Sequence, residues 1–310
     1  MRFLFLFLPV FLFSFEFKVA TYNLENLFDA QKQGNEYKEY TPNNRHGWNE
    51  MMVEKKIANL ARVIEDIDAD IIALVEVENK EVLQKLNFAL KNKRYPYLFY
   101  PTKKSHVSIE TALLSRYPIE KTESILIKDQ PRGIHKVTIT LENRPLDVYI
   151  NHWPAQREKE QERLMYATNL RNALAKEGSR EFLLMGDFNS PLHVLKDDWG
   201  LAFNRVLKSN DTDFGLSNLW YELPEQKRYS HSYGKNRSAL DHIVISKTLH
   251  DGKGIEYKKG SFQPFIKPYM LNEEGLPKRW QITDRGRGRH LGEGYSDHLP
   301  ITAIFHIDAH

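Results

Sequence analysis

Six short stretches of the chain place a carboxylate, an amide or an imidazole directly after a run of apolar residues. Carboxylate and amide oxygens are the ligands that Mg²⁺ and Mn²⁺ prefer, a carboxylate beside water can accept its proton, and imidazoles can donate to phosphoryl oxygens. Metal-assisted hydrolysis of a phosphate ester needs these groups. The stretches are TYNLEN from Thr21, LVEVEN from Leu74, INHWP from Ile150, LMGDFNS from Leu184, ALDHIVIS from Ala239 and GYSDHLP from Gly294.

Each of these stretches also has a purely structural explanation. Asp187-Phe188-Asn189 with Pro191 fits an Asx turn, His152 fits a hydrogen-bonded core histidine, and Asp297 fits a cap. One stretch alone would favour that explanation. Six in one cysteine-free chain with few competing motifs favour a shared catalytic site.

The oxygen-bearing residues divide into metal ligands and groups that act on water or phosphate. Glu76, Asp297 and the amide of Asn23 supply hard oxygen ligands, which suit Mg²⁺ or Mn²⁺ rather than Zn²⁺. Asp187 can take a proton from water, and Asn189 can donate to a phosphate oxygen or orient the attacking group.

The imidazoles supply the complementary donors. His152 and His298 can donate to phosphoryl oxygens or to the leaving group. Asp241 can hold the second nitrogen of an imidazole and stabilise its charged form. These side chains act together only if the fold brings six distant segments to one place.

The elements that position these residues are strands and helices without a strict alternation. Helical spacing of apolar residues predicts helices over residues 49–67, 81–91 and 156–176. The predicted strands are residues 17–22, 70–75, 97–100, 111–115, 124–128, 134–141, 146–151, 182–185, 240–245 and 301–305. Antiparallel-looking strands with helices between them favour an α/β fold in which two packed sheets are flanked by helices.

Composition excludes several classes of protein. The chain has 310 residues, 41% of them apolar and 27% charged, which fits one large globular domain and excludes wholesale disorder. Cysteine is absent, which excludes disulfides, thiolate metal sites, iron–sulfur clusters and cysteine nucleophiles. A net charge of +3 is too small to establish a polyanionic partner.

The first seventeen residues, MRFLFLFLPVFLFSFEF, predict an export signal. Arg2 precedes an apolar run over residues 3–13, which is shorter than the roughly 18 residues that span a bilayer. No A-x-A triplet follows, Ser14 is the best small residue near the end, and an uncleaved anchor is the alternative. We expect a signal over residues 1–17, a catalytic domain over residues 18–310, a periplasmic or extracellular location, and no stable membrane insertion after processing.

Residues 246–290 are polar, irregular and basic. They carry ten Lys or Arg against five Asp or Glu, a local charge of +5. Because this segment directly precedes the Asp297-His298 motif, it is a candidate surface for phosphate contacts. A solvated face or covering loop is the alternative.

In this order, TYNLEN, LVEVEN, ETALLSRYPI, INHWP, LMGDFNS, ALDHIVIS and GYSDHLP resemble the endonuclease/exonuclease/phosphatase superfamily over roughly residues 18–306. That superfamily includes pancreatic-type deoxyribonucleases, abasic-site endonucleases, sphingomyelinases and inositol-phosphate phosphatases. INHWPAQ, followed by a charged helix, resembles its secreted bacterial members. The resemblance implies a four-layer α/β sandwich of two packed, mostly antiparallel sheets.

The resemblance also implies a role for each motif residue. The metal-site positions are matched by Glu76, Asp297 and, close to both metal and phosphate, Asn23. The catalytic positions are matched by His152, Asp187, Asn189, Asp241 and His298. A histidine at position 152 is typical of the pancreatic-type nucleases and sphingomyelinases and argues against the abasic-site branch.

Three further positions are less clearly matched. Glu25 stands where abasic-site enzymes place an aspartate, so its role as a ligand is open. His242 replaces a more usual aromatic residue and is interpreted as structural. Arg116, in LSRYPI, is a candidate phosphate-binding residue, with an ion pair to a neighbouring carboxylate as the alternative.

The leading hypothesis is a secreted endonuclease that uses Mg²⁺ or Mn²⁺ to hydrolyse nucleic-acid phosphodiester bonds, with DNA as the first candidate partner. The alternative keeps the catalytic core but acts on sphingomyelin or a small phosphoester. Trp153, Trp199 and Trp220 are candidate membrane contacts, although core roles suit them as well. A binding module with an inactive site would lack a site residue, and every motif residue is present.

Overall fold

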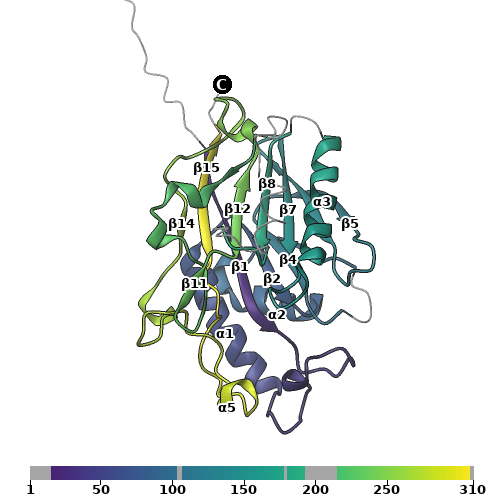
Figure 1. The fold of residues 1–310 in the computed structure, drawn as a ribbon, viewed down its shortest axis with the longest axis vertical. Helices are drawn as coiled ribbons and strands as arrows, with labels where there is room; N and C mark the ends of the chain where they lie inside the picture. The colour runs from purple at the N-terminus through teal and green to yellow at the C-terminus, as the bar shows by residue number, and fades with distance from the viewer. Residues whose placement is uncertain (1–14, 103–106, 178–179, 193–214, 308–310) are drawn as a thin grey trace, which may run out of the picture.

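The computed structural model describes residues 15–102, 107–177, 180–192 and 215–307. Two sheets stack against each other, with helices α1 (Glu50–Ile67) and α2 (Lys80–Ala89) on one outer side and α3 (Glu160–Glu177) on the other. Figure 1 shows α3 beside β5 and β7, with α1 in the lower part of the molecule. The predicted α/β sandwich of two mostly antiparallel sheets flanked by helices is therefore confirmed.

The first sheet contains seven strands in the order β13-β15-β1-β2-β4-β3, with β14 also paired to β15. Within it β1 and β2 are parallel, and the other pairs are antiparallel. Its strands are β1 (Phe15–Leu27), β2 (Ile71–Val77), β3 (Tyr97–Phe99), β4 (Glu110–Ser115), β13 (Ile255–Tyr257), β14 (Gln263–Pro264) and β15 (Ile301–Ile307).

Among the described residues, the second sheet contains six strands in the order β5-β6-β7-β8-β12-β9, and of these pairs only β7 and β8 are parallel. Its strands are β5 (Ile119–Ile125), β6 (Ile134–Leu141), β7 (Arg144–His152), β8 (Phe182–Asp187), β9 (Ser217–Asn218) and β12 (Asp241–Ile245). A separate hairpin joins β10 (His231–Tyr233) to β11 (Asn236–Ser238), and a short helix α5 covers Thr283–Gly286.

Apolar periodicity and polar caps explain the helices. In α1, Val53, Ile57, Leu60 and Ile64 recur at helical spacing and are buried. The side chain of Asn49 accepts the backbone N–H of Met52 at the start of this helix. Burial of each such aliphatic side chain contributes about 1.5–3 kcal/mol. The helix therefore packs its apolar face on the first sheet, which holds β1 and β2 in place.

Three expectations from the sequence need correction. The strand expected at residues 124–128 is β5, Ile119–Ile125, a largely exposed strand at the sheet edge whose polar sequence hides the pattern. Strand β1 begins at Phe15, because Phe15–Phe17 pair with β15, so these residues belong to the fold; residues 1–14 lie outside the described residues. The basic segment 246–290 is not wholly irregular, since β13 and β14 within it pair with β15.

Candidate catalytic site

Neighbouring strands of the second sheet place three of the predicted residues in a row. His152 at the end of β7 lies opposite Asp187 on β8, and Asp187 lies opposite Asp241 at the start of β12. Gly186 makes this close approach possible, because it has φ +126° and a Cβ there would lie 2.0 Å from the Asn151 carbonyl oxygen. The second sheet thus places the imidazole of His152 and the buried carboxylates of Asp187 and Asp241 side by side on three neighbouring strands.

The first sheet supplies Asn23 and Glu76. The parallel pairing of β1 with β2 sets Asn23 opposite Val75, one residue before Glu76. The β2–β4 register shifts between Val75 and Val77, and Glu76 has a φ of 68°. A bulge of this kind redirects a side chain that would otherwise follow the strand alternation. Here it directs Glu76 toward Asn23.

Asn23 links the two sheets at this end. Its amide nitrogen donates to Glu76 Oε1 at 3.2 Å and to Asp187 Oδ2 at 3.1 Å. Its amide oxygen accepts the backbone N–H of Glu25 at 3.0 Å, and Glu76 Oε2 accepts that of Asn26 at 2.8 Å. In this arrangement the Asn23 amide nitrogen orients two carboxylates, and its oxygen, which accepts one hydrogen bond, keeps a second lone pair. That Asn23 is a metal ligand stays a prediction.

Asp241 and His298 form a buried pair, as the resemblance implied. His298 Nδ1 and Asp241 Oδ2 lie 2.7 Å apart, while His298 Nε2 lies 3.9 Å from Asp187 Oδ2 and 4.0 Å from Asp297 Oδ1. Burial opposes the charged imidazole, but Asp241, Asp187 and Asp297 outweigh it and raise the pKa of His298 well above its usual range. His298 is therefore a protonated donor at neutral pH.

The carboxylates carry more negative charge than the protein neutralises. Burial, followed by repulsion from Asp241, raises the pKa of Asp187 to about 7. Burial and the charge of Asp297 likewise raise the pKa of Glu76. Burial also opposes ionisation of Asp297, but His298, His231 and Arg279 lower its pKa on balance. Such an excess of buried negative charge favours binding of a cation.

The donor set fits a hard divalent cation. Glu76 and Asp297 offer carboxylate oxygens, and burial, followed by the charge of Asp297, raises the pKa of Glu76. Asp187, Asp241 and His298 also offer atoms that lie within 4.8 Å of one another. However, the hydrogen bond between His298 and Asp241 occupies one atom of each. We therefore assign the latter three to proton and hydrogen-bond chemistry and retain Glu76 and Asp297 as the expected ligands.

His152 faces the same region from β7. Its Nε2 lies 3.7 Å from Glu76 Oε1, and its Nδ1 is buried without a hydrogen-bond partner among the described residues. Burial, and then the positive charges of Arg132 and His298, lower its pKa well below the usual value. His152 is therefore neutral at pH 7 and can offer one N–H donor.

Asn189 stabilises the turn after β8. Its backbone N–H donates to Asp187 Oδ1 at 2.8 Å, and its side-chain amide donates to the Trp153 carbonyl at 3.0 Å. This is the geometry of the Asx turn considered above, at a residue with φ 48°. The turn fixes the position of the Asp187 carboxylate and links it to the residue after β7. Asn189 therefore positions Asp187.

Arg116 does not belong to the site. The antiparallel register of β2 and β4 places Ser115 opposite Ile71, at the end of β2 remote from Glu76. There the Arg116 guanidinium pairs with Asp70 at 2.9 Å and with Asp68. The prediction that Arg116 binds substrate is wrong, and the ion pair that the sequence left as the alternative is correct.

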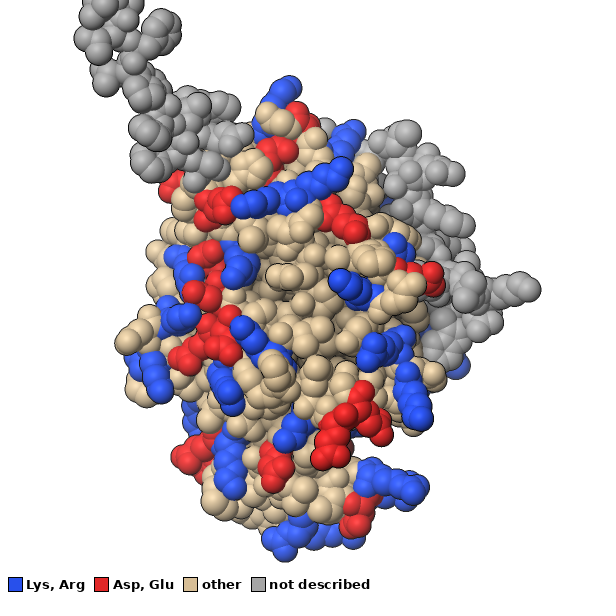
Figure 2. Space-filling model, turned by 90° about the vertical axis from the view of Figure 1, so that its left-hand side faces the viewer, with Lys and Arg blue, Asp and Glu red and all other residues tan. Residues whose placement is uncertain are grey.

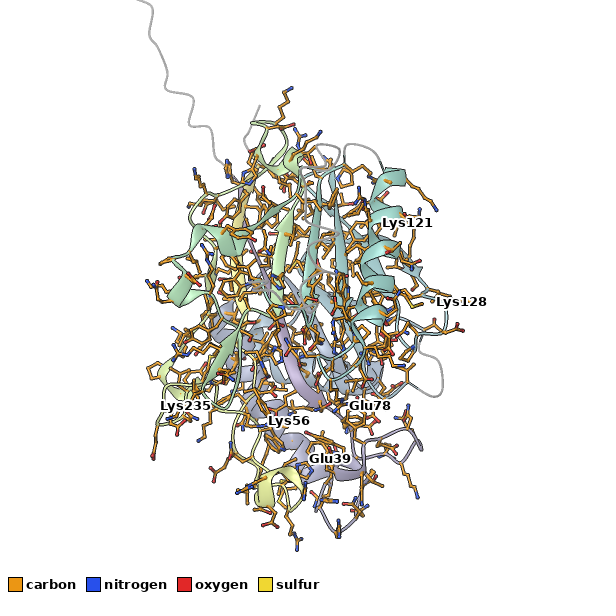
Figure 3. The ribbon with its side chains drawn as sticks, in the orientation of Figure 1. Glu39, Lys56, Glu78, Lys121, Lys128 and Lys235 are labelled. Atoms are coloured by element: carbon orange, nitrogen blue, oxygen red, sulfur yellow. The ribbon has the colours of Figure 1, made fainter. Side chains whose placement is uncertain are left out.

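Glu25 holds the basic segment against the first sheet. Its carboxylate accepts from Arg279 at 2.6 Å and from the Trp280 backbone N–H at 2.8 Å. Its carbonyl accepts from Lys56, a fully buried lysine of α1, at 2.6 Å. Burial lowers the pKa of Lys56 to about 8. Figure 3 labels Lys56 near the lower end of the sandwich, below the strands that carry the site.

His242 and the tryptophans Trp153 and Trp220 lie in the core. His242 is fully buried, contacts the Ser190 carbonyl at 3.0 Å and Asn218 at 3.0 Å, and is structural as interpreted. Trp153 and Trp220 have no exposed surface, so they are not membrane contacts. Trp199 lies outside the described residues.

Sequence reasoning missed Arg132 and His231, and it included Arg279 only as a member of the basic segment 246–290. Arg132, between β5 and β6, lines a cavity together with Glu76 and His152. The His231 ring lies 4.6 Å from that of His298, and Arg279 lies 3.7 Å from Asp297. None of the three follows an apolar strand, which is the signal that revealed the others.

The two stacked sheets thus carry buried carboxylates and a histidine–aspartate pair at one end. The family model described as Endonuclease/Exonuclease/phosphatase matches residues 18–307. The chain belongs to this family, whose members are metal-dependent phosphoester hydrolases. No curated protein matches it in sequence.

Solved structures of the same fold act on different substrates. A Bacteroides thetaiotaomicron endonuclease/exonuclease/phosphatase family protein has a TM-score of 0.61 and 14% identity, over 96% of this chain and 99% of that one. D. rerio TDP2 complexed with a single-strand DNA product has a TM-score of 0.59 and 15% sequence identity, over 94% of this chain and 98% of that one. A B. thetaiotaomicron mannosyl-6-phosphatase has a TM-score of 0.58 and 13% sequence identity, over 93% of this chain and 98% of that one. At these identities the likeness concerns the fold alone.

Proposed function

We propose that the protein hydrolyses a phosphoester with a divalent cation, using Asp187 as proton acceptor and His298 as donor. The observation that carries this proposal is the buried arrangement in which His298 is bonded to Asp241 at 2.7 Å and faces Asp187 at 3.9 Å. Asp187 has a pKa raised to about 7, which suits a group that accepts a proton from water near neutral pH.

The remaining site residues bind and orient. A cation held by Glu76 and Asp297 would neutralise charge on the phosphoryl oxygens. His298, kept charged by Asp241, donates to a phosphoryl oxygen, and neutral His152 supplies a further N–H. Asn23 keeps the Glu76 and Asp187 carboxylates in register across the two sheets.

A nucleic-acid phosphodiester, predicted from the sequence, is one candidate substrate. The DNA complex of D. rerio TDP2 supports it at the level of the fold. The basic segment supports it less, because Lys258 pairs with Glu16 at 2.7 Å and Arg279 pairs with Glu25. Figure 2 shows positive and negative side chains interspersed on the face of β11 and β14, rather than a continuous basic surface. A compact phosphoester is the second candidate, favoured by the cavity beside Glu76 and His152.

One experiment tests the chemistry before the substrate. Purified protein is incubated with plasmid DNA, RNA, sphingomyelin, bis(4-nitrophenyl) phosphate and a hexose 6-phosphate, with Mg²⁺, Mn²⁺ or chelator. We expect hydrolysis of at least one phosphoester that the chelator abolishes. Glu76→Gln should lose this activity and bind the metal more weakly in calorimetry, because a neutral amide replaces a carboxylate ligand. Hydrolysis of none of them by metal-loaded protein would refute the proposal, and unchanged metal affinity would remove Glu76 from the metal site.

We also propose export, supported by the apolar run over residues 3–13 that follows Arg2. Within the described residues, no helix is long and apolar enough to cross a membrane. Since Phe15 and Phe17 pair with β15, we expect the processed chain to begin close after Ser14. Mass spectrometry of the protein from its host measures this; a chain that retains Arg2 would support the anchor instead.

A further inference from the structure

A cavity of about 650 Å³ opens beside the catalytic site and is lined by both Glu76 and His152. Its other walls come from the segment before α1, the connection between β5 and β6, the residues after β7 and the first turns of α3. This volume lies within the roughly 300–1,000 Å³ of small-molecule sites. A molecule bound here would place one end against the residues that carry out the reaction.

Arg132 lines this cavity from the connection between β5 and β6, and His152 lines it from the end of β7. The β6–β7 ladder ends at the pair His135 and Ile150, close in sequence to both residues. The Tyr166 hydroxyl of α3 donates to the Arg132 carbonyl at 2.8 Å and fixes the backbone. The Arg132 Nε is buried without a hydrogen-bond partner, and the described part of the chain offers its guanidinium no ion pair.

Arg132 and His152 both line this cavity. His152 Nδ1 is the second buried atom without a partner, and a neutral imidazole can carry its proton on either nitrogen. Buried polar groups are normally hydrogen-bonded, so the side chains of Arg132 and His152 keep unused hydrogen-bonding capacity beside this cavity. A phosphoryl group has the acceptor oxygens to satisfy an arginine and an imidazole together.

The rest of the cavity does not suit a polyanion. Glu39, Glu76, Glu158 and Glu162 line it together with Lys38, Arg132 and Arg157, so the lining carries one more acidic than basic side chain. Channels for nucleic acid strands are instead lined by an excess of positive charge. Carboxylates accept hydrogen bonds from hydroxyl groups and repel additional phosphates. Figure 3 labels Glu39 at the lower end of the molecule, close to the end of β1.

The cavity wall is held in shape before any ligand binds. Arg163 of α3 is buried and donates to the carbonyls of Pro154 at 3.2 Å and Ala155 at 2.7 Å, directly after β7. Its Nε also bonds Glu160 at 2.9 Å. A wall fixed in this way reduces the ordering cost of binding a small ligand.

We propose that this cavity binds the organic group of a compact, hydroxyl-rich phosphoester, such as a phosphorylated sugar or polyol, and that Arg132 holds its phosphate. This assignment rests on the proposed phosphoester hydrolysis and names the substrate class of that same site. Arg132 is a substrate-binding residue, and Glu39, Glu158 and Glu162 are the acceptors for substrate hydroxyls.

The test measures binding separately from turnover. A non-hydrolysable phosphonate analogue of a hexose 6-phosphate is titrated into Mg²⁺-loaded protein by calorimetry. We expect Arg132→Gln to weaken binding roughly ten- to hundredfold, since charge-assisted hydrogen bonds are lost. Arg132→Lys should lie between, because it keeps the charge but not the planar fork. Arg144→Gln, at the start of β7 and the opposite end of the strand, is the matched control and should bind like the parent.

A second comparison tests the hydroxyl contacts. Hexyl phosphate carries the same phosphate without hydroxyls. Glu162→Gln should raise the KM for hexose 6-phosphate more than that for hexyl phosphate, whereas Arg132→Gln should raise both. Unfolding curves for each variant establish that the fold is retained.

The outcomes separate the two proposals. Analogue binding that Arg132→Gln weakens supports the cavity assignment, even if no metal gives turnover, in which case only the proposed hydrolysis fails. No analogue binding, or binding unchanged in folded Arg132→Gln and Arg132→Lys, overturns the assignment. Metal-dependent cleavage of oligonucleotides alone, with no sugar phosphate turned over, would overturn the assignment and leave phosphoester hydrolysis standing.

Discussion

The acidic residues at the two ends of strand β2 differ in whether a lysine or arginine pairs with them. Before β2, Asp68 and Asp70 are both paired with Arg116, and Asp70 also accepts the backbone N–H of Lys18 at 2.8 Å. At the other end, Glu76 accepts hydrogen bonds from Asn23 and Asn26 but has no lysine or arginine within ion-pair distance among the described residues. The same sheet thus carries a matched set of charges at one end and an unmatched set at the other.

The direction of the pKa shift separates these two sets. Burial opposes ionisation of Asp68, but hydrogen bonds from Arg116 and Lys93 lower its pKa on balance. Burial and like charges instead raise the pKa values of Glu76 and Asp187. Carboxylates whose pKa is raised by burial and like charges are candidates for a functional site. Glu76 and Asp187 meet this condition, whereas Asp68 does not.

The largest expected effect concerns the pair at the functional end. His298→Ala should lower kcat by about 10²–10⁴-fold or more, because a proton donor is lost. Asp241→Asn should also lower kcat, since it leaves His298 without the carboxylate 2.7 Å away. The double variant should be much less impaired than the product of the two losses, because the pair acts as one unit.

A double-mutant cycle at saturating metal measures this coupling. Fully multiplicative losses would show that Asp241 and His298 act independently and that Asp241 is not the positioning residue.

A stability measurement sharpens the comparison further. The folded pKa of Asp187, about 7, lies above its ordinary value of 3.8. Between these values the unfolded chain binds fewer protons than the folded one, so stability falls as pH rises through this window. Metal-free Asp187→Asn should therefore exceed the parent in Tm by several degrees at pH 8, and the difference should shrink toward pH 4.

The measurement is thermal unfolding in chelator at several pH values. Mg²⁺ should raise the Tm of the parent at pH 8, because it binds the folded state. A Tm difference independent of pH would mean that buried charge on Asp187 does not destabilise this end.

The smallest effect is expected at the structural end. Arg116→Ala should reduce the free energy of unfolding by about 1 kcal/mol, a modest value because the ion pairs are partly exposed. The kcat/KM should stay within twofold of the parent, since Arg116 lies at the remote end of β2. A large loss of activity in a variant with parental stability would return Arg116 to the site.

The sequence by itself identified the candidate site residues. Apolar runs ending in Asn23, Glu76, His152, Asp187 and Asp241 are local patterns. In the structure His152, Asp187 and Asp241 lie at strand ends, Glu76 lies one residue before the end of β2, and Asn23 lies within β1 where its pairing with β2 shifts. Helix α1 could also be predicted closely, because its apolar spacing and its Asn49 cap are both local. Edge strand β5 could not, since a largely exposed strand needs no apolar alternation.

Only the tertiary structure decided which arginine faces the site. Arg116 follows an apolar strand and a recognisable motif, yet the antiparallel register of β2 and β4 carries it to the far end. Arg132 follows no strand and belongs to no motif, yet the β6–β7 hairpin and Tyr166 bring it to the cavity beside His152. Strand direction and register arise from pairing between distant segments, so a local pattern can identify a residue's chemistry without revealing the end of the sheet at which it acts.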